Sequence, residues 1–394
     1  MLSFEEARTS LIAAAQPLQR GECVDTLHAA GRVLAEEVLA SLNVPPADNS
    51  AMDGYAVRAA DVAANIALPI SQRIPAGSVP QPLLPGTAAR IFTGAQIPPG
   101  ADAVVMQERC VLDGENVRVE VAPQAGDNVR RMGEDIRDGS EVLKAGAVLR
   151  SQELGLLASL GVAQVTVVAR LRVAVFFTGD ELRMPGESLA QGQIYNSNRF
   201  VLYGLLGEMG CDIVDLGIVR DDLQATREAL RQAARDADLI LTCGGVSVGE
   251  EDHVKAAVEA EGALQSWRVA IKPGKPLAFG RVGETPFIGL PGNPVSSFVT
   301  FQMLVKPYLR RMQGSAASMP SALPMRADFA WKKSVPVREF LRVRRNAEGG
   351  LDLFPNQGSG VLTSCTWADG LVENAPETLI NAGDVVRYLP FASL

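Results

Sequence analysis

The chain has 394 residues, more than one hydrophobic core usually supports, so two to four domains are expected. Hydrophobic residues make up 47% and charged residues 21%, and the formal net charge of −8 argues against binding to a nucleic-acid backbone, so an anionic ligand needs a local basic cluster. The chain has only two histidines, and its five cysteines form no CxxC pair, which argues against a histidine triad, a multi-histidine metal site and a zinc or disulfide framework.

The first segment predicts a helix, because Ser3 and Glu6 form a capping-box pattern before apolar residues at helical spacing. This start is acidic, and no run of about 18 apolar residues follows anywhere in the chain. We therefore expect a soluble, cytoplasmic protein.

The next segments predict a small β domain between two helical stretches. Helical stretches are expected at roughly Thr26–Ala40 and at Ser151–Leu160, while short apolar runs split by Pro and Gly fill Val44 to about Arg137. We place a discontinuous helical linking domain at residues 1–40 and 139–170, with an inserted β domain at residues 41–138.

The second half predicts an α/β domain at residues 171–317. The runs LRVAVFF, DIVDLGIV, ADLILTC and PFIGL are unbroken and apolar, with helical segments such as Asp222–Ala237 between them, which is typical of buried parallel strands. Short strands and Gly/Pro turns then predict a small β barrel or sandwich at residues 318–394. The fold class is therefore multidomain α/β.

Three polar loops, FTGDEL, CGGVSVGEED and LPGNP, each follow directly after one of the predicted buried strands. Open α/β sheets bind their ligands at the carboxyl ends of the strands. These loops are therefore expected to surround one site.

The segment DNSAMDGYA (residues 48–56) carries two carboxylates and a glycine without the apolar periodicity of a core element. In one interpretation it is a surface turn in which Asn49 and Asp53 bond their own backbone. In the other it belongs to a functional site.

The loop GGVSVGEED contains glycines that let backbone amides approach a ligand closely, followed by acids at the start of a helix. Either the acids only complement the helix dipole, or the amides hold a phosphate while Asp252 helps to bind magnesium. The loop is neither a Walker loop nor a GxGxxG fingerprint, because its spacing differs from both.

Two further loops suit anions. In IKPGKP a Pro-Gly turn holds Lys272 and Lys275 close together, which an anion would stabilise, although a solvated surface pair is the alternative. In LPGNPVSS, Ser296 lies at a helix start that suits an oxyanion, although Pro291 and Asn293 are also ordinary turn formers.

The remaining charged runs are less informative. FTGDEL supplies Asp180 and Glu181, whereas VRRMGED is a charge run of the kind that is usually solvated. The pattern alone gives no role to Arg342 in EFLRVRR or to Ser359 in NQGSG.

In this order, DNSAMDGYA, FTGDEL, GGVSVGEED and IKPGKP resemble the molybdopterin molybdenumtransferase family, MoeA, also found as the E domain of gephyrin; the resemblance runs from about residue 5 to about residue 390. It implies a central parallel-sheet molybdopterin-binding domain with an inserted small β domain, a helical linking domain and a C-terminal β barrel. It also implies that molybdate supplies molybdenum to adenylylated molybdopterin, with release of AMP.

The resemblance also assigns site residues by matching positions. The matched catalytic positions are Asp53, Thr93, Arg130, Asp135, Glu181, Asp221 and Asp252. The matched substrate-binding positions are Gly244, Gly245, Gly249, Lys272, Lys275, Pro291, Pro294, Ser296, Arg342 and Ser359, with molybdate at Lys275, Ser296, Arg342 and Ser359. Asp221 and Asp252 are the implied ligands of Mg²⁺.

The family is dimeric, with the inserted β domain of one subunit facing the α/β domain of the other, so Asp53 and Thr93 are candidates to act across the interface. Transient contact with the adenylyltransferase and with apo-molybdoenzymes is a further implication. The chain departs from the family at His253, Arg268 and Asn356, where Tyr, Lys and His are frequent. The last departure concerns the anion pocket around Ser359.

Two other functions remain as alternatives. The adenylyltransferase of the preceding step resembles residues 171–315, but it lacks the flanking domains, and its glycine loop runs on to an Arg-Asp pair. A gephyrin-like scaffold would use the same fold for peptide binding, whereas the acids and lysines here favour catalysis. Tungstate in place of molybdate stays open, because the two oxyanions are nearly alike in size and charge.

Overall fold

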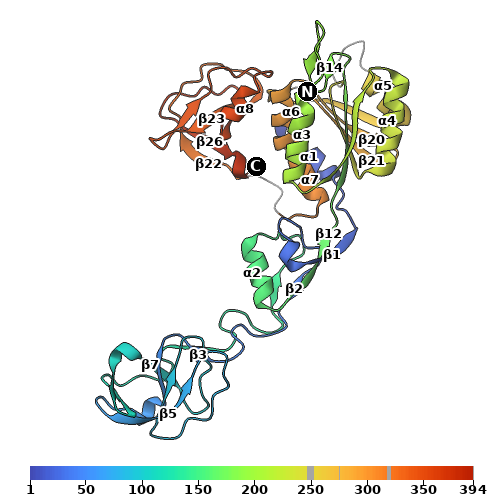
Figure 1. The fold of residues 1–394 in the computed structure, drawn as a ribbon. Coiled ribbons are helices and arrows are strands. Elements are labelled where there is room, and N and C mark those ends of the chain that lie inside the picture. Colours follow the sequence, from blue (N-terminus) through green and yellow to red (C-terminus); the bar gives the residue numbers. More distant parts are fainter. Residues whose placement is uncertain (246–252, 275, 317–320, 394) are drawn as a thin grey trace.

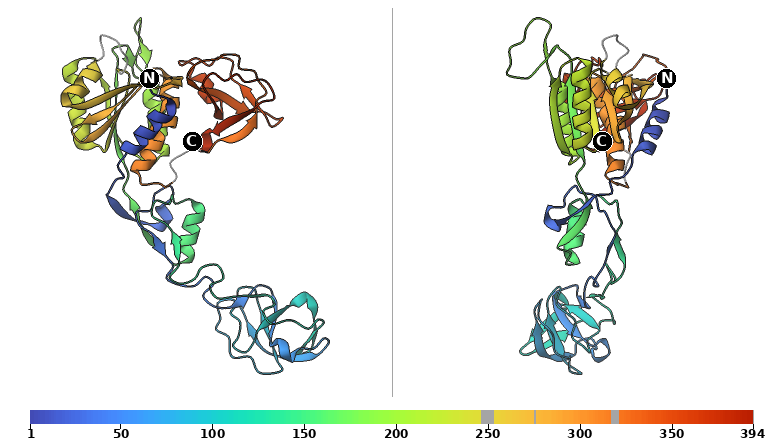
Figure 2. Two further views of the ribbon diagram at one scale, coloured as in Figure 1. Left: turned by 180° about the vertical axis from the view of Figure 1, so that it is seen from behind. Right: turned by 90° about the vertical axis from the view of Figure 1, so that its right-hand side faces the viewer.

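The computed structural model describes residues 1–245, 253–274, 276–316 and 321–393. The chain is elongated, with two packed domains at one end, a slender middle region and a separate β domain at the far end (Figure 1). Figure 2 shows the same arrangement from behind and from the side. Gly249, Asp252 and Lys275 of the predicted site lie outside the described residues. Within the described part of the chain, no helix is long and apolar enough to span a membrane.

The α/β domain contains a six-stranded mixed sheet. Its strands, in spatial order, are β16 (Asp212–Val219), β13 (Arg172–Thr178), β17 (Leu239–Cys243), β21 (Thr285–Leu290), β20 (Pro276–Val282) and β18 (Gly262–Arg268). The first four strands run parallel, as predicted, whereas β20 and β18 are antiparallel. The short turn between β20 and β21 forces their antiparallel pairing, since a parallel pair needs a long crossover. A wholly parallel sheet is therefore corrected to a mixed one.

Helices cover both faces of this sheet. One face carries α4 (Leu223–Asp236) and α5 (His253–Glu261), and the other carries α1 (Phe4–Ala14), α3 (Ser197–Glu208), α6 (Pro294–Thr300), the π-helical turn Phe301–Val305 and α7 (Lys306–Met312). The predicted capping box of α1 is confirmed, and the Asp222 side chain caps α4. Beyond the carboxyl end of β13, the chain makes a small projection containing β14 (Leu182–Arg183) and β15 (Ile194–Tyr195).

The linking region consists mainly of strand pairs rather than helices. Strand β1 (Gly21–Asp25) pairs with β12 (Gln164–Val168), and β2 (Val38–Leu39) pairs with β11 (Glu141–Leu143) beside α2 (Ser151–Ser159). The predicted helix at Thr26–Ala40 is wrong, because only the 3₁₀ turn Thr26–His28 forms and Gly31 adopts φ +76°. After that turn, Leu34 donates its N–H to the Ala147 carbonyl across the region.

Helix α1 also lies elsewhere than predicted. It packs in the α/β core through Phe4, Ala7 and Leu11 rather than in the linking region. The reason is its buried apolar stripe, which meets the large core of the α/β domain. The boundaries drawn between the domains stay predictions.

The inserted region is a β domain, as its sequence pattern indicates. Its six-stranded sheet has the order β7 (Ala103–Met106), β4 (Gly54–Val57), β6 (Ala88–Ile91), β5 (Ala67–Ile74), β9 (Asn116–Val119) and β8 (Cys110–Asp113). Strands β3 (Asn49–Ser50) and β10 (Val129–Arg130) pair separately, and 3₁₀ turns form at Ala59–Asp61 and Gln107–Arg109.

The C-terminal domain is a second mixed sheet. Its elements are β22 (Leu323–Arg326), β23 (Arg338–Arg345), β24 (Leu351–Leu353), α8 (Thr363–Trp367), β25 (Gly370–Asn374), β26 (Val385–Pro390) and the 3₁₀ turn Phe391–Ser393. The strand β19 (Ile271–Lys272) from the α/β domain pairs with β23, so the two domains share a sheet. The pairings among the described strands run along an open path from β19 to β22, so the predicted barrel is not confirmed.

Candidate functional site

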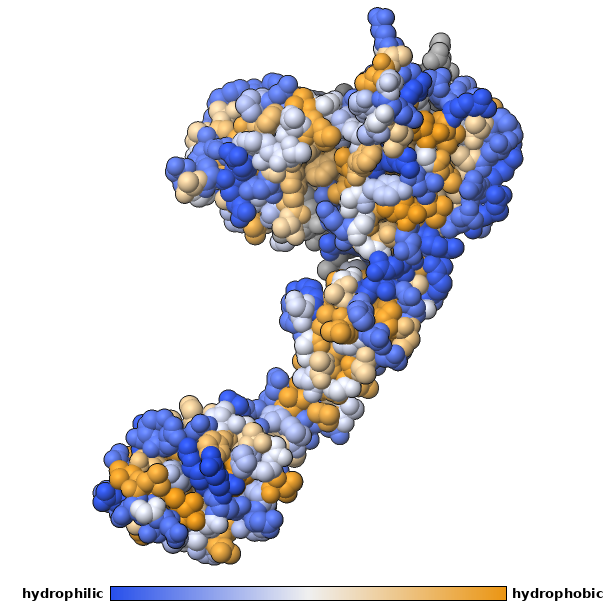
Figure 3. Space-filling model, viewed as in Figure 1, coloured by the Kyte–Doolittle hydropathy of each residue, from blue (hydrophilic) through white to orange (hydrophobic). Residues whose placement is uncertain are grey.

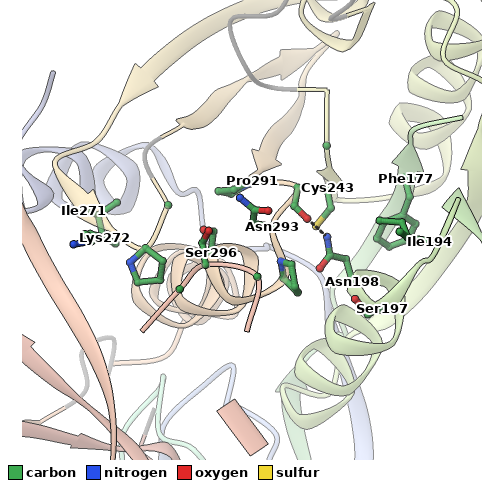
Figure 4. A pocket seen from close by; sticks show the side chains of 18 of the residues that line it. Phe177, Ile194, Ser197, Asn198, Cys243, Ile271, Lys272, Pro291, Asn293 and Ser296 are labelled. Carbon is green, nitrogen blue, oxygen red and sulfur yellow. Dashed lines mark hydrogen bonds between the residues drawn. The ribbon is translucent and has the colours of Figure 1, made fainter. Parts of the chain in front are cut away.

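A cavity of about 1140 Å³ lies between the carboxyl edge of the α/β sheet and the C-terminal domain (Figure 4). Strands β13, β17 and β21 run parallel and end together at this edge. The loops that follow them therefore reach the same cavity, as the sequence predicts. From the predicted set the cavity wall contains Glu181, Gly244, Lys272, Pro291, Pro294, Ser296 and Ser359.

The start of the glycine loop depends on glycine. Gly244 has φ +96°, and a Cβ atom there would lie 2.9 Å from the Thr178 carbonyl oxygen. Gly245 has φ +65°, and a Cβ atom there would lie 2.4 Å from a methyl group of Val254. Both positions exclude a side chain, and of the two Gly244 lines the cavity, with bare backbone where β17 ends.

The lysine loop and the C-terminal domain both pack against helix α6. Gly274 has φ +100°, and a Cβ atom there would lie 2.8 Å from Thr300 Oγ1. The Ser359 carbonyl accepts a hydrogen bond of 3.0 Å from the Val295 amide at the start of α6. Ser296 is 3% exposed and lies between these contacts in the cavity wall. Three predicted loops are thus brought to one helix start.

Helix α3 contributes two amides that the sequence did not reveal. Asn196 caps the helix by accepting from the Arg199 amide, and Asn198 Nδ2 donates to the Gly292 carbonyl at 2.7 Å. Both residues line the cavity, and neither Asn196 Nδ2 nor Asn198 Oδ1 has a hydrogen-bond partner among the described residues. Asparagine at a helix start is so common that no sequence signal distinguishes these two.

A second cavity, of about 340 Å³, adjoins the first and contains Arg342. The two cavities share the wall residues Lys272, Pro273, Gln357 and Gly358. Of the predicted molybdate positions, Ser296 and Ser359 line the large cavity, whereas Arg342 lines the small one. The predicted anion set is therefore divided between two adjoining cavities.

Arg342 is a buried cation with neutral partners. It is 1% exposed, and its guanidinium donates to Ser364 Oγ, the Phe340 carbonyl and the Gly358 carbonyl at 3.1 to 3.3 Å. No carboxylate among the described residues forms an ion pair with it. Burial lowers the pKa of Arg342 to about 10. A buried cation without a carboxylate partner is suited to bind an anion.

Lys272 is partly exposed and forms an ion pair with a buried carboxylate. Its Nζ atom lies 3.0 Å from Glu339 Oε1, and Glu339 is 1% exposed. Neither Glu339 nor its other partner, Trp331, was identified from the sequence. The sequence EFLRVRR alone does not predict that the side chain of its glutamate points inward.

Four predicted catalytic residues lie in the inserted domain, far from the cavities (Figure 1). Asp53 Oδ1 accepts from the Thr93 amide at 2.7 Å and from the Thr93 hydroxyl at 2.8 Å. These bonds, the amide's first, lower the pKa of Asp53. Asp53 therefore joins two loops and does not simply bond its own turn. Arg130 and Asp135 are exposed nearby, on the strand and loop that follow Asn128.

Gly54, next to Asp53, is required by close packing of backbone. A Cβ atom at Gly54 would lie 1.9 Å from the Val105 carbonyl oxygen of the neighbouring strand. The segment DNSAMDGYA thus has a structural constraint at its glycine and an accessible carboxylate beside it.

Of the two predicted magnesium ligands, only Asp221 lies among the described residues. Asp221 follows β16 and lines neither cavity, and Asp252 lies outside the described residues. Across the described ranges, no three His, Cys, Asp or Glu side chains are placed to hold a metal ion.

Comparisons with known proteins agree with this architecture. Family models match three successive stretches, described as the MoeA N-terminal region (domain I and II) at residues 2–161, a probable molybdopterin binding domain at residues 174–311 and the MoeA C-terminal region (domain IV) at residues 324–391. A molybdopterin molybdenumtransferase of Haemophilus influenzae is 39% identical over 402 residues, covering 100% of both chains. The chain belongs to the molybdopterin molybdenumtransferase family.

Other members of the family support the assignment. Molybdopterin molybdenumtransferase 2 of Mycobacterium tuberculosis is 41% identical over 303 residues, covering 74% of this chain and 75% of the relative. The crystal structure of a molybdopterin biosynthesis MoeA protein from Pyrococcus horikoshii matches with a TM-score of 0.87 at 29% identity, covering 99% of this chain and 100% of that one. The molybdenumtransferase architecture therefore extends over the whole chain.

Proposed function

We propose that this chain inserts molybdenum from molybdate into adenylylated molybdopterin and releases AMP, as a step of molybdenum cofactor biosynthesis. The observation that carries this proposal is the buried, carboxylate-free Arg342 in a small cavity that adjoins a much larger one. An elongated substrate and a small anion thereby meet at a shared wall.

The large cavity accounts for the adenylylated pterin. Its volume of about 1140 Å³ is slightly larger than that of most small-molecule sites, which suits a substrate as long as an adenylylated pterin. Backbone at Gly244 lines the cavity without a side chain, which suits the close approach of a phosphate. We assign Gly245, the next residue in the chain, to the same ligand. We also assign substrate contacts to Pro291, Pro294 and, outside the described residues, Gly249.

The small cavity accounts for the oxyanion. Lys272, Lys333 and Arg342 contribute three cationic groups to its described wall, and Glu339 contributes one anionic group. The balance of two positive charges suits a tetrahedral dianion such as molybdate. We assign Ser296, Ser359 and Lys275 to the same oxyanion as it reaches the large cavity.

Magnesium would be held by Asp221 and Asp252 together with substrate phosphates and water. This fits the chemistry of the ion, which needs only one or two carboxylates when phosphates supply further oxygens. When bound, magnesium neutralises charge that develops on the departing AMP phosphate. Glu181, in the cavity wall, is the described carboxylate that we assign to the same region.

A second copy of the chain would complete the site. Asp53 and Thr93, with Arg130 and Asp135, lie in a domain that is remote from the cavities of their own chain (Figure 1). We infer that the chain is a homodimer in the cytoplasm, in which the inserted domain of one subunit faces the cavity of the other. Transient contacts with the adenylyltransferase and with apo-molybdoenzymes would bring substrate and take product.

The activity is tested by incubating the protein with adenylylated molybdopterin and molybdate. We expect AMP release and activation of an apo-molybdoenzyme to rise together, and tungstate in a parallel reaction measures oxyanion preference. AMP release without cofactor formation would contradict insertion. MoeA regions flank the molybdopterin-binding domain on both sides, which does not favour the adenylyltransferase alternative. The relatives are named molybdopterin molybdenumtransferases, which does not favour the scaffold alternative.

The dimer is tested by complementation. Asp53→Asn and Glu181→Gln each disable one half of the composite site, so mixed dimers regain one intact site. We expect the mixture to recover activity that neither variant has alone. Absence of recovery after subunit exchange, proved by mass spectrometry of tagged subunits, would place Asp53 outside the partner's site.

A further inference from the structure

The ammonium group of Lys272 lies at the boundary of the two cavities and is bonded to the C-terminal domain. Lys272 lines both cavities, and its Nζ atom lies 3.0 Å from Glu339 Oε1 (Figure 4 shows Lys272 at the edge of the large cavity). In the parallel pairing of β19 with β23, Lys272 and Glu339 are register partners. Backbone pairing therefore sets the two side chains against each other.

The carboxylate of Glu339 is itself fixed. Its Oε2 atom accepts from Trp331 Nε1 at 2.7 Å, and Trp331 is 7% exposed. The Glu339 side chain is 2% exposed, whereas the Lys272 side chain is 42% exposed. A rigid, buried acceptor thus holds one end of a lysine that is otherwise open to the cavities.

We propose that Glu339 is a positioning residue that orients the Lys272 ammonium toward the bound oxyanion, with Trp331 fixing the carboxylate. This inference rests on the proposed function, because the oxyanion is the one handled by that reaction. An ammonium has three N–H donors, and Glu339 engages one, which sets the direction of the other two.

Attraction cannot be the role of Glu339, since a carboxylate in the wall of an anion cavity repels the anion. Its burial also costs free energy that an apolar residue would not. The gain is directional: without Glu339, the long lysine side chain would sample many rotamers. If Glu339 had only a structural role, its replacement would lower the stability of the protein and leave the affinity for the oxyanion unchanged.

The test compares Glu339→Gln with Glu373→Gln. In Glu339→Gln, one of the two oxygen positions becomes an NH₂ donor, so the side chain can no longer accept from Lys272 at one position and from Trp331 at the other. Glu373 lies in the adjacent strand β25, pairs with Arg338 and Arg387, and lines neither cavity, so it is a matched control. We expect Glu339→Gln to raise the molybdate concentration for half-maximal AMP release about tenfold. The affinity for AMP should change less than about twofold, and Glu373→Gln should leave both unchanged.

A second measurement is independent of the reaction. The rate at which an N-hydroxysuccinimide ester acylates Lys272, followed by peptide mass spectrometry, should rise several-fold in Glu339→Gln and not in Glu373→Gln. Trp331→Phe, which keeps the ring and removes the Nε1 donor, should have an intermediate effect. Unchanged acylation of Lys272 in Glu339→Gln would overturn the positioning role, even if the wild-type protein is active. A wild-type protein without molybdate-dependent AMP release would instead contradict the proposed function.

Discussion

Replacing Arg342 by methionine should change both the stability of the protein and its affinity for the oxyanion. Burial lowers the pKa of Arg342 from its ordinary value to about 10, which corresponds to a cost of about 3 kcal/mol for keeping the charge inside the folded protein. Arg342→Met relieves this cost but loses three hydrogen bonds from a charged donor, each worth about 1.5–3 kcal/mol. The lost hydrogen bonds outweigh the relieved cost, so we expect the free energy of unfolding to fall by about 2–6 kcal/mol.

The affinity for the oxyanion should also differ between the wild type and Arg342→Met. A ligand at a concentration of a hundred times its Kd stabilises the folded protein by about 2.7 kcal/mol. For a cooperatively unfolding unit of about 150–250 residues, this corresponds to a rise of about 5–10 °C in Tm. Scanning fluorimetry with molybdate should show this rise for the wild type and not for Arg342→Met. An equal rise in the variant would refute the assignment of Arg342 to the anion.

The pH dependence of this comparison also follows from the lowered pKa. A base whose pKa is lowered by folding is charged in both states below the folded value, so the cost of burial is constant there. The cost falls only as pH rises above about 10 toward the ordinary pKa of an arginine. The difference in stability between wild type and Arg342→Met should therefore not vary between about pH 6 and about pH 9.

Three further predictions concern the metal, the acid and the lysine loop. Excess chelator should stop AMP release and added Mg²⁺ should restore it; full turnover in chelator would contradict the role of Asp221 and Asp252. Because Thr93 lowers the pKa of Asp53 below 3.8, its charge is lost only in stronger acid, so the activity ratio of wild type to Asp53→Asn should be constant from about pH 5 to about pH 9. Gly274→Ala places a Cβ atom 2.8 Å from Thr300 Oγ1, so it should destabilise the protein by roughly 1–3 kcal/mol and weaken molybdate binding. The control is Gly283→Ala, at φ +58° with open space around it, which should leave molybdate binding unchanged.

The sequence predicted the α/β core well because that core is made of local patterns. Unbroken apolar runs such as LRVAVFF can only be buried strands or buried helices, and their short length favours strands. The prediction of a helix at Thr26–Ala40 in the linking region was wrong for the opposite reason. The apolar residues between Thr26 and Ala40 are buried by strands more than 100 residues away, and Gly31 at φ +76° ends the local helix.

The site was predictable where it consists of loops that follow strands. Gly244, Pro291 and Ser296 reach one cavity because parallel strands end at one edge. Glu339 and Trp331 were missed, because their place in the wall is set by the pairing of β19 with β23 across two domains. Period-2 alternation does not specify which acids of a strand face a neighbouring domain.

Hydrophilic and apolar residues are intermixed over the face of the molecule that Figure 3 shows. The two described cations that we assign to the oxyanion, Arg342 and Lys272, lie between the α/β and C-terminal domains and differ in their partners. Arg342 is buried against neutral acceptors, so its unbalanced charge favours an incoming anion. Lys272 is held by a buried carboxylate, so its charge is locally balanced and its direction is fixed. We therefore propose that attraction and orientation are supplied by different residues. On this proposal Arg342→Met should weaken binding of the anion, while Glu339→Gln should misdirect the Lys272 ammonium that contacts it.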